Sequence, residues 1–393
     1  MERILNLKSP NLNLFGKTYK ATFIRRPNRF IVECQLNKRK VRAYLPNPGR
    51  LWELFLPDAE LFLTKSSDPE RRTEFTCVGV EKDGAPVMLH THHINTVVKW
   101  LIERGRIPAL RGYKIVRPEV TFGKSRFDFL LDKNGEQLVL EVKSCTLFGR
   151  NIAMFPDAVT ARGKKHLEEL AGLSGKGVKS GVIFVVHSPS AKYFLPEYHT
   201  DLDFSKTLFS VRNNILVNAI GVSWQNNLTL SPVIRELKIP WDLIKNEADD
   251  RGNYILILHL KRPARISAGG LGTITFQKGH YLYVGSARKN LQRRIERHRR
   301  HRKNLHWHID YLREKAEFIN ALPVRSGKQL ECEISGALLK VARWSEQGFG
   351  SSDCNCNSHL FGMTDNPLRS PAFIKLLQHF RMDRLEHELN LDS

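Results

Sequence analysis

Short apolar runs separated by turn residues fill the first quarter of the chain. Three of these runs are residues 21–24, 30–34 and 61–64. Pro-Asn-Pro-Gly at residues 46–49 punctuates them. Short β-branched and aromatic runs between such turn residues are typical of strands. Many short strands in one stretch predict a small β-barrel, which we assign to residues 1–90.

Helical and strand patterns alternate over residues 91–240. A helix is expected from His92 to Arg104, and another lies near residues 157–172. The run at residues 182–186, Val-Ile-Phe-Val-Val, has the length and β-branching of a buried strand. This order predicts an α/β core.

A linker is predicted at residues 241–251, because Pro240, an acidic run and Gly252 interrupt the pattern. A new strand begins at Tyr254, and a second α/β unit is expected over residues 252–393. The expected fold class is therefore mixed α/β (α+β) and multidomain, with a barrel of the oligonucleotide-binding (OB) kind at its N-terminal end.

The net charge of the chain indicates the kind of partner that it binds. The 393 residues include 62 Lys and Arg against 40 Asp and Glu, a formal net charge of +22. Such a balance favours a polyanionic partner, DNA or alternatively RNA, through phosphate neutralisation. The alternative is a basic protein that binds no nucleic acid.

The cysteine and hydropathy patterns predict a cytoplasmic protein without membrane association. Six cysteines are scattered, which is not the pattern of a disulfide framework. The N-terminus lacks the apolar stretch of a secretory signal, and no run approaches the roughly 18 apolar residues of a membrane span.

Two carboxylates and a lysine are predicted to converge on one hairpin. Asn134-Gly135 between two apolar runs is a strong signal for a type I′ turn. That turn places Asp128 opposite Glu141, and Lys143 points from the same face. Opposed carboxylates repel unless a cation lies between them, and their oxygens suit Mg²⁺ or Mn²⁺.

Such a site can hydrolyse a phosphodiester. The metal polarises a phosphoryl oxygen, and Lys143 orients water or offsets charge in the transition state. The alternative is an exposed strand edge whose charges are merely solvated. Glu119 is a further candidate metal ligand, or a surface glutamate. Arg162 and His166 share a helix face at i, i+4 and could hold phosphate beside the metal, or form a solvated basic face.

Four motifs resemble those of the sugar fermentation stimulation protein family. They are LPNPGRL at 45–51, RFDFL at 126–130, LEVKS at 140–144 and FPDAVTARGKKHL at 155–167. The resemblance covers about residues 15–235. It implies an OB-like domain followed by a PD-(D/E)xK restriction-endonuclease-like α/β core, with DNA binding as the family's property.

On that nuclease motif, Asp128, Glu141 and Lys143 fall on the three core positions. We assign DNA contacts in these motifs to four residues, which are Asn47, Arg50, Arg162 and His166. The family name records a sugar phenotype, which these residues do not explain.

A strongly basic helix is predicted after Asn290, its expected N-cap. Nine Lys or Arg lie between Arg288 and Lys303. This density is typical of phosphate binding, although a charge run is often only a solvated face. We assign further DNA contacts to Arg294, Arg297 and His298.

The motifs around this helix resemble the GIY-YIG endonuclease superfamily over about residues 250–385. The matching segments are GNY at 252–254, YVG at 283–285, HWHIDYL at 306–312, ECE at 331–333 and GFGSSDCNCNSHL at 348–360. Asn253 and Val284 replace the isoleucines of the superfamily pattern, which alters strand residues rather than reacting groups.

The superfamily implies that a tyrosine helps to activate water, an arginine stabilises phosphate charge and a glutamate holds a metal ion. Tyr254 and Tyr283 take the first role and Arg293 the second. Glu333 takes the third, with Glu331 as the competing candidate.

A cysteine-rich segment ends this module. Cys354, Cys356 and His359 could bind Zn²⁺. The histidines that could complete four ligands are His298, His306 and His308. The C-x-C spacing is shorter than that of the usual structural sites, and Cys332 is distant in sequence. The pattern favours a reduced loop with a packing role, so Zn²⁺ is not expected.

Together these features predict a DNA-binding, metal-dependent nuclease. The alternative is a non-catalytic DNA-binding regulator of sugar metabolism that keeps nuclease folds as binding platforms. RNA processing would share the chemistry and differ in substrate. Catalysis is favoured because an inert platform has no need of opposed carboxylates.

Overall fold

The computed structural model describes residues 11–66 and 70–390. Contacts divide the chain into two units. The first unit comprises Met1–Glu197 with Asp203–Trp241, and the second comprises Tyr198–Leu202 with Asp242–Ser393. Within the described residues, no helix has both the length and the apolar character needed to cross a bilayer.

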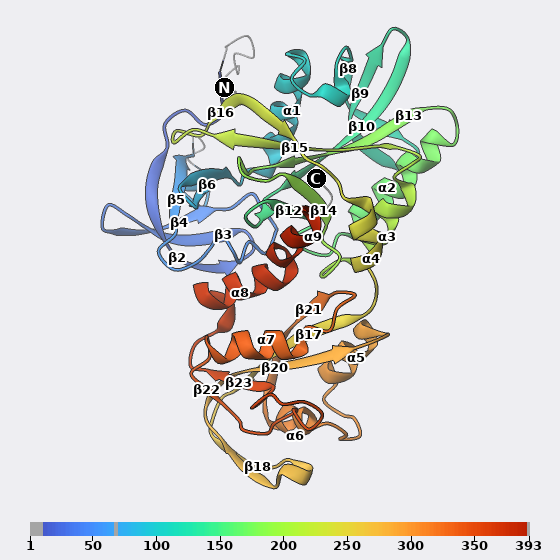
Figure 1. Cartoon of the computed structure of the whole chain (residues 1–393). Coiled ribbons are helices and arrows are strands. Elements are labelled where there is room, and N and C mark those ends of the chain that lie inside the picture. Colours follow the sequence, from blue (N-terminus) through green and yellow to red (C-terminus); the bar gives the residue numbers. More distant parts are fainter. Residues whose placement is uncertain (1–10, 67–69, 391–393) are drawn as a thin grey trace. The chain divides into compact units, whose positions relative to one another are not determined.

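The first unit opens with a β-barrel, drawn in blue in Figure 1. Its strands follow the order β4-β3-β2-β5-β6-β7, and a parallel pairing of β4 with β6 closes it. Asn37 and Lys38, both at positive φ, form the tight β3–β4 turn. The strands are β2 (Tyr19–Asn28), β3 (Ile31–Leu36), β4 (Arg39–Tyr44), β5 (Glu60–Lys65), β6 (Phe75–Lys82) and β7 (Ala85–Met88).

A seven-stranded sheet of order β1-β16-β15-β13-β10-β9-β8 forms the centre of the same unit. β10, β13 and β15 run parallel to one another, and the other pairings are antiparallel. The strands are β1 (Leu12–Asn13), β8 (Lys114–Phe122), β9 (Ser125–Lys133), β10 (Glu136–Cys145), β13 (Lys179–Val186), β15 (Leu216–Trp224) and β16 (Thr229–Glu236). A small sheet adds β11 (Leu147–Phe148), β12 (Ile152–Phe155) and β14 (Tyr193–Pro196).

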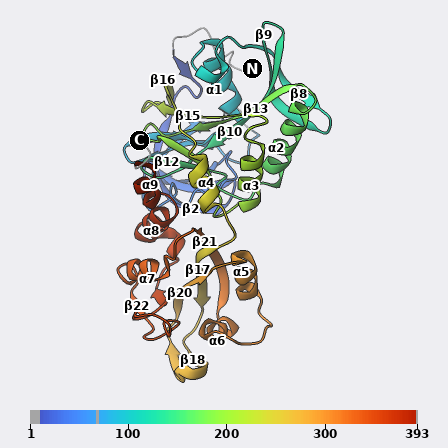
Figure 2. The same ribbon diagram turned by 45° about the vertical axis from the view of Figure 1, so that its right-hand side comes forward.

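Helices cover both faces of this large sheet (Figures 1 and 2). α1 (Ile94–Glu103) packs Trp100 and Leu101 with Leu140 in one core. α2 (Ala161–Ser174) and α3 (Leu202–Val211) pack Leu167 and Leu208 into a second core. Because β13 lies between the two cores, both of its faces are buried, which explains its uninterrupted apolar run.

The second unit is built on an antiparallel sheet of order β21-β17-β20-β23-β22. Its strands are β17 (Gly252–Leu260), β20 (Gly279–Ala287), β21 (Glu317–Arg325), β22 (Trp344–Ser345) and β23 (Leu360–Met363), with a separate hairpin of β18 (Ala264–Ser267) and β19 (Thr273–Phe276). Its helices are α5 (Leu291–Arg299), α6 (His308–Lys315), α7 (Glu331–Leu339), α8 (Pro371–Arg381) and α9 (Glu386–Asn390). The mixed α/β, multidomain class with an OB-like barrel is confirmed.

The predicted linker is largely a helix, α4 (Trp241–Glu247). Glu247, the first residue of the acidic run, is buried. It accepts hydrogen bonds from Ser326 Oγ (3.2 Å) and the Gly327 amide (3.1 Å), and it pairs with Arg384. The sequence could not distinguish a solvated acid from one held by a distant arginine.

Candidate active sites

The hairpin of the first unit has the predicted turn and register. Asn134 and Gly135 have φ angles of 55° and 87°, as a type I′ turn requires. Pairing runs from Lys133–Glu136 to Phe129–Leu140. At the next position Asp128 uses its carboxylate instead, and its Oδ2 accepts the Val142 amide at 2.7 Å.

Asp128 is half-buried and fixed from two sides. Besides the Val142 amide, the Asn95 side chain of α1 donates to its Oδ1 at 2.7 Å. Burial raises the pKa of Asp128, and the neighbouring Glu141 carboxylate raises it further. The structure thus brings the two predicted carboxylates close enough for their charges to interact.

Glu141 is buried, and among the described residues only one of its two carboxylate oxygens has hydrogen-bond partners. Its Oε1 accepts from Lys143 Nζ at 2.6 Å and from His166 Nδ1 at 2.7 Å. Its Oε2 is buried without a hydrogen-bond partner among the described residues. Burial acts to raise the pKa of Glu141, but the bonds from His166 and Lys143 outweigh it and leave that pKa lowered. An ionised carboxylate with an orphaned oxygen beside Asp128 fits a divalent cation.

His166 supports Glu141 rather than facing DNA, which corrects the sequence-based assignment. It is 4% exposed. Because Nδ1 donates to Glu141, Nε2 is left to accept from Arg162 Nε at 3.4 Å, as in a neutral imidazole. Arg162 is exposed, so it remains available to a phosphate.

Glu119 does not join this cluster. It is exposed and pairs with Arg126 at 3.4 Å. Its φ of 52° interrupts the regular alternation of side chains along β8. The prediction of Glu119 as a metal ligand is therefore corrected to a surface ion pair.

The 45–51 loop is a structural junction within the first unit. Asn47 is buried, and its Oδ1 accepts the Gly49 amide at 3.0 Å. The Leu51 amide donates to Asp157 Oδ2 at 2.7 Å, and a Cβ on Gly49 would approach that same oxygen to 2.7 Å. Asn47 therefore shapes this loop and is not exposed for DNA contact.

Arg50 is partly exposed at the same loop. Its guanidinium lies 4.9 Å from the centroid of the Trp52 ring. Of the two residues that the sequence assigned to DNA contact here, only Arg50 is partly exposed.

In the second unit, Tyr254 and Tyr283 lie together on neighbouring strands. Their ring centroids are 6.5 Å apart, and burial raises the pKa of each hydroxyl. Tyr254 lies opposite Gly285, where any Cβ would collide with its hydroxyl. This contact explains the glycine of the Y-x-G segment.

Tyr254 belongs to a buried relay of three side chains. Its hydroxyl lies 2.9 Å from His298 Nε2, and His298 Nδ1 lies 3.6 Å from Asp310 Oδ1. Burial lowers the pKa of His298, which favours the neutral ring and a free acceptor at Nε2. Spacing alone gave no signal for Asp310, although it lies in the 306–312 segment.

Asp310 is fully buried and organises the surrounding cations. It accepts from Arg297 NH2 at 2.9 Å and pairs with Lys303 Nζ at 2.6 Å. Burial acts to raise its pKa, but the neighbouring His298, Arg297 and Lys303 outweigh burial and lower that pKa. Arg297 and His298 thus face inward, which corrects their assignment as DNA contacts.

The arginine beside the tyrosines is Arg294, not Arg293. Arg294 NH1 donates to the Ser286 carbonyl at 2.5 Å, and its positive charge acts on both tyrosine hydroxyls. Arg293 is exposed on α5. Adjacent helical residues point about 100° apart, so an error of one position selects the wrong face. The assignment of Arg293 as the arginine beside the tyrosines is therefore corrected to Arg294.

The carboxylate at this site is the competing candidate, Glu331. Its Oε2 accepts from Ser286 Oγ, and its Oε1 lies 3.3 Å from His359 Nδ1. Glu331 also acts electrostatically on both tyrosines. Glu333 is exposed, so its assignment as a metal ligand is corrected.

The outer surface of the basic helix carries a cluster of exposed positive charges. Asn290 precedes α5 in a left-handed conformation and its side chain does not cap the helix; Asp250 Oδ1 instead accepts the Gln292 amide at 3.0 Å. The exposed cations, here called the α5 basic surface, are Arg288, Lys289, Arg293, Arg299, Arg300 and Arg302.

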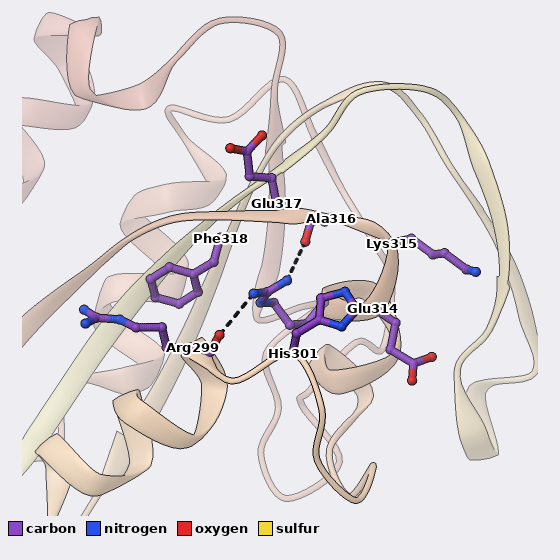
Figure 3. Close-up of a pocket in the computed structure, with 8 residues that line it drawn as sticks. Arg299, His301, Glu314, Lys315, Ala316, Glu317 and Phe318 are labelled. Carbon is purple, nitrogen blue, oxygen red and sulfur yellow. Dashed lines mark hydrogen bonds between the residues drawn. The ribbon is translucent and has the colours of Figure 1, made fainter.

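A pocket of about 540 Å³ lies where α5 and α6 end (Figure 3), and neither Tyr254 nor Tyr283 is among the residues that line it. Arg299, His301 and Lys315 contribute basic groups to its lining. Arg313 donates to the Ala316 carbonyl (2.9 Å) and the Arg299 carbonyl (3.0 Å), so its guanidinium is held within the pocket wall.

Comparisons with known proteins follow this division of the chain. Three family models match, and they are the SfsA N-terminal OB domain at residues 24–89, the Sugar fermentation stimulation protein RE domain at 92–227 and the Domain of unknown function DUF123 at 253–382.

A sugar fermentation stimulation protein homolog from Methanothermobacter thermautotrophicus is 34% identical over 225 residues, covering 56% of this chain and 93% of the relative. A homolog from Clostridium tetani is 38% identical over 192 residues, covering 49% and 84%. The solved structure of Pyrococcus furiosus SfsA in complex with Ca²⁺ aligns with a TM-score of 0.54 and 26% identity, covering 59% of this chain and 99% of that chain. The chain therefore belongs to the sugar fermentation stimulation protein family, with a DUF123 domain in its C-terminal part.

Proposed function

We propose that this chain is a DNA-binding, metal-dependent nuclease with two phosphodiesterase sites. The first comprises Asp128, Glu141 and Lys143 on a PD-(D/E)xK-like hairpin. The observation that carries this proposal is the buried, unpartnered Oε2 of Glu141 beside Asp128. Two adjacent carboxylates with an orphaned oxygen are costly unless a cation satisfies them.

A hard divalent ion suits these oxygens, and Mg²⁺ or Mn²⁺ is the proposed cofactor. The Ca²⁺ in the structure of the Pyrococcus furiosus relative supports an oxygen-rich site in this family. When bound, the ion would polarise a phosphoryl oxygen. Asn95 and His166 hold the two carboxylates, and Lys143 offsets charge that develops in the transition state.

The second site is GIY-YIG-like and uses Tyr254, Arg294 and Glu331. His298 can take the Tyr254 proton across 2.9 Å, and Asp310 stabilises the imidazolium that results. Arg294 offsets charge on the phosphate, and Glu331 supplies the carboxylate for a metal ion. The α5 basic surface binds the phosphate backbone.

Cleavage of labelled linear, nicked and branched DNA, and of RNA, tests this proposal. Wild type with Mg²⁺ or Mn²⁺ is expected to cut at least one DNA substrate, and the double variant Asp128→Asn, Arg294→Ala is expected to cut none. Absence of cleavage by wild type on every substrate, with divalent metal bound, contradicts nuclease activity.

The second candidate function is a non-catalytic DNA-binding regulator. The α5 basic surface favours it, because exposed cations bind phosphate without any catalytic group. This function predicts DNA affinity that falls steeply with salt and survives in the double variant, with no cleavage by any form of the protein.

A further inference from the structure

Three cysteines and a histidine from two distant segments meet in the second unit. Cys332 lies in the first turn of α7, and Cys354, Cys356 and His359 lie in the loop between β22 and β23. Their four ligand atoms are all within 4.8 Å of one another. Across residues 11–66 and 70–390, no other group of three or more His, Cys, Asp or Glu is this compact.

These distances suit a tetrahedral ion. With zinc–ligand bonds near 2.3 Å to sulfur and 2.0–2.1 Å to nitrogen, ligand atoms lie about 3.6–3.8 Å apart. Cys354 Sγ lies 3.4 Å from His359 Nε2, so a small adjustment would admit the ion. The backbone of His359 is held on both sides, since its amide donates to the Phe349 carbonyl (2.8 Å) and its carbonyl accepts the Val284 amide (2.9 Å).

The loop between β22 and β23 has little regular structure of its own to hold it in place. Residues 346–359 contain no helix or strand. Few backbone bonds tie the loop internally, among them Gly348 to Asn357 at 2.8 Å and a long bond from Cys354 to Ser351 at 3.5 Å. Irregular loops of this length need another source of order, and a metal that bridges the loop to α7 would provide it.

We propose that Cys332, Cys354, Cys356 and His359 bind one structural Zn²⁺. Three thiolates and an imidazole form a soft, tetrahedral ligand set, which selects zinc over Mg²⁺, Mn²⁺ or Ca²⁺. Four protein ligands leave no open position, so the ion holds structure rather than activating water. Zn²⁺ was not expected from the sequence because Cys332 is distant in sequence from Cys354 and Cys356, and only folding brings it beside them.

The zinc site also borders the second candidate active site. His359 turns Nε2 toward the thiols and Nδ1 toward Glu331, 3.3 Å away. This is the carboxylate–histidine–zinc arrangement, in which an outer carboxylate orients the ligand. Glu331 also directly precedes Cys332, so zinc would fix both its backbone and its partner. This link to Glu331 rests on the proposed function, whereas the zinc site does not.

Metal content of the purified full-length chain tests the site. Wild type is expected to carry one zinc per chain, and Cys332→Ser or Cys354→Ser is expected to lose it. Cys34→Ala, which removes a buried cysteine of the barrel, is the matched control and keeps it. If the serine variants do not fold, cobalt substitution of wild type decides, because tetrahedral thiolate ligation gives a sulfur-to-cobalt charge-transfer band.

A wild-type chain that takes up neither zinc nor cobalt stoichiometrically overturns the site, as does full zinc content in Cys332→Ser. A disulfide among these cysteines in protein prepared with reductant overturns it as well. Glu331→Gln separates the two proposals, since it is expected to abolish cleavage at the second site while zinc stays bound. Failure of the nuclease proposal would leave the zinc result unchanged.

Discussion

The two candidate sites differ in how the chain assembles them. Asp128, Glu141 and Lys143 lie on one hairpin, and the Asn134-Gly135 turn fixes their register. The second site instead draws Tyr254 from β17, Arg294 from α5 and Glu331 from α7. A local hairpin makes side-chain direction predictable from sequence, whereas a site gathered from several elements depends on how each helix rotates when it packs.

The same difference explains which residues were predicted wrongly from the sequence. Strand side chains alternate with a period of two, so the sequence predicted that Asp128, Glu141 and Lys143 lie near one another on the hairpin, as they do. In the second site, the arginine and the glutamate were each placed on the wrong side of a helix. Glu119 and Arg293, which the structure places away from the two sites, therefore serve as control positions.

Removing Asp128 is expected to have the largest effect. In a chain whose second site is disabled by Arg294→Ala, Asp128→Asn should lower single-turnover DNA cleavage in Mg²⁺ on the order of 10³-fold, since it removes half of the negative charge that holds the ion. Glu119→Gln on the neighbouring strand should cleave at the parental rate. Equal losses in both variants would mean that the site extends to Glu119, against the geometry described above.

Arg294 is expected to be needed for rapid cleavage at the second site, whereas Arg293 is not. In an Asp128→Asn chain, Arg294→Ala should lower the cleavage rate at saturating DNA on the order of 10²-fold, because it removes charge stabilisation beside the tyrosines. Arg293→Ala should leave that rate intact and only weaken salt-sensitive binding. The reverse pattern would restore the sequence-based assignment.

His166 is expected to act through Glu141. His166→Ala should weaken activation by Mg²⁺ about 10–100-fold at the first site, the range for residues that orient metal ligands. The measurement is cleavage rate against Mg²⁺ concentration in the Arg294→Ala chain, with DNA affinity measured alongside. A fall in DNA affinity at unchanged metal dependence would mean that His166 contacts phosphate after all.

The smallest effect concerns Glu53, a buried carboxyl of the first unit. Burial, and then the nearby Asp157 carboxyl, raise the pKa of Glu53 from 4.5 to about 8. A raised pKa means that the folded state binds this proton more tightly, so stability falls as pH rises from about 4.5 to about 8. Glu53→Gln should remove this pH dependence of stability. The change in the free energy of unfolding from pH 5 to pH 8 should therefore be about 1–3 kcal/mol more favourable in the variant than in wild type.

Urea unfolding of the two proteins at both pH values measures that gain. Arg162→Gln, an exposed change in the same unit, should follow the wild-type pH dependence. An identical slope in Glu53→Gln would show that this carboxyl is ionised in the folded protein at neutral pH.

The sequence by itself determined several secondary-structure elements and the grouping of Asp128 and Glu141 on one hairpin. Period-two alternation, β-branching and the Asn-Gly turn are local properties, so the barrel strands, the buried run at 182–186 and the 128–143 hairpin could be predicted. The excess of positive charge could also be read from the sequence. Which of those charges face solvent could not.

Only the tertiary structure decided which side chains meet. It placed Arg297 and His298 beside Asp310, Arg294 beside the tyrosines, and His166 against Glu141. It also brought Cys332 to Cys354 and His359. These contacts join segments far apart in the chain, and their geometry depends on helix rotation and packing, which residue spacing does not encode.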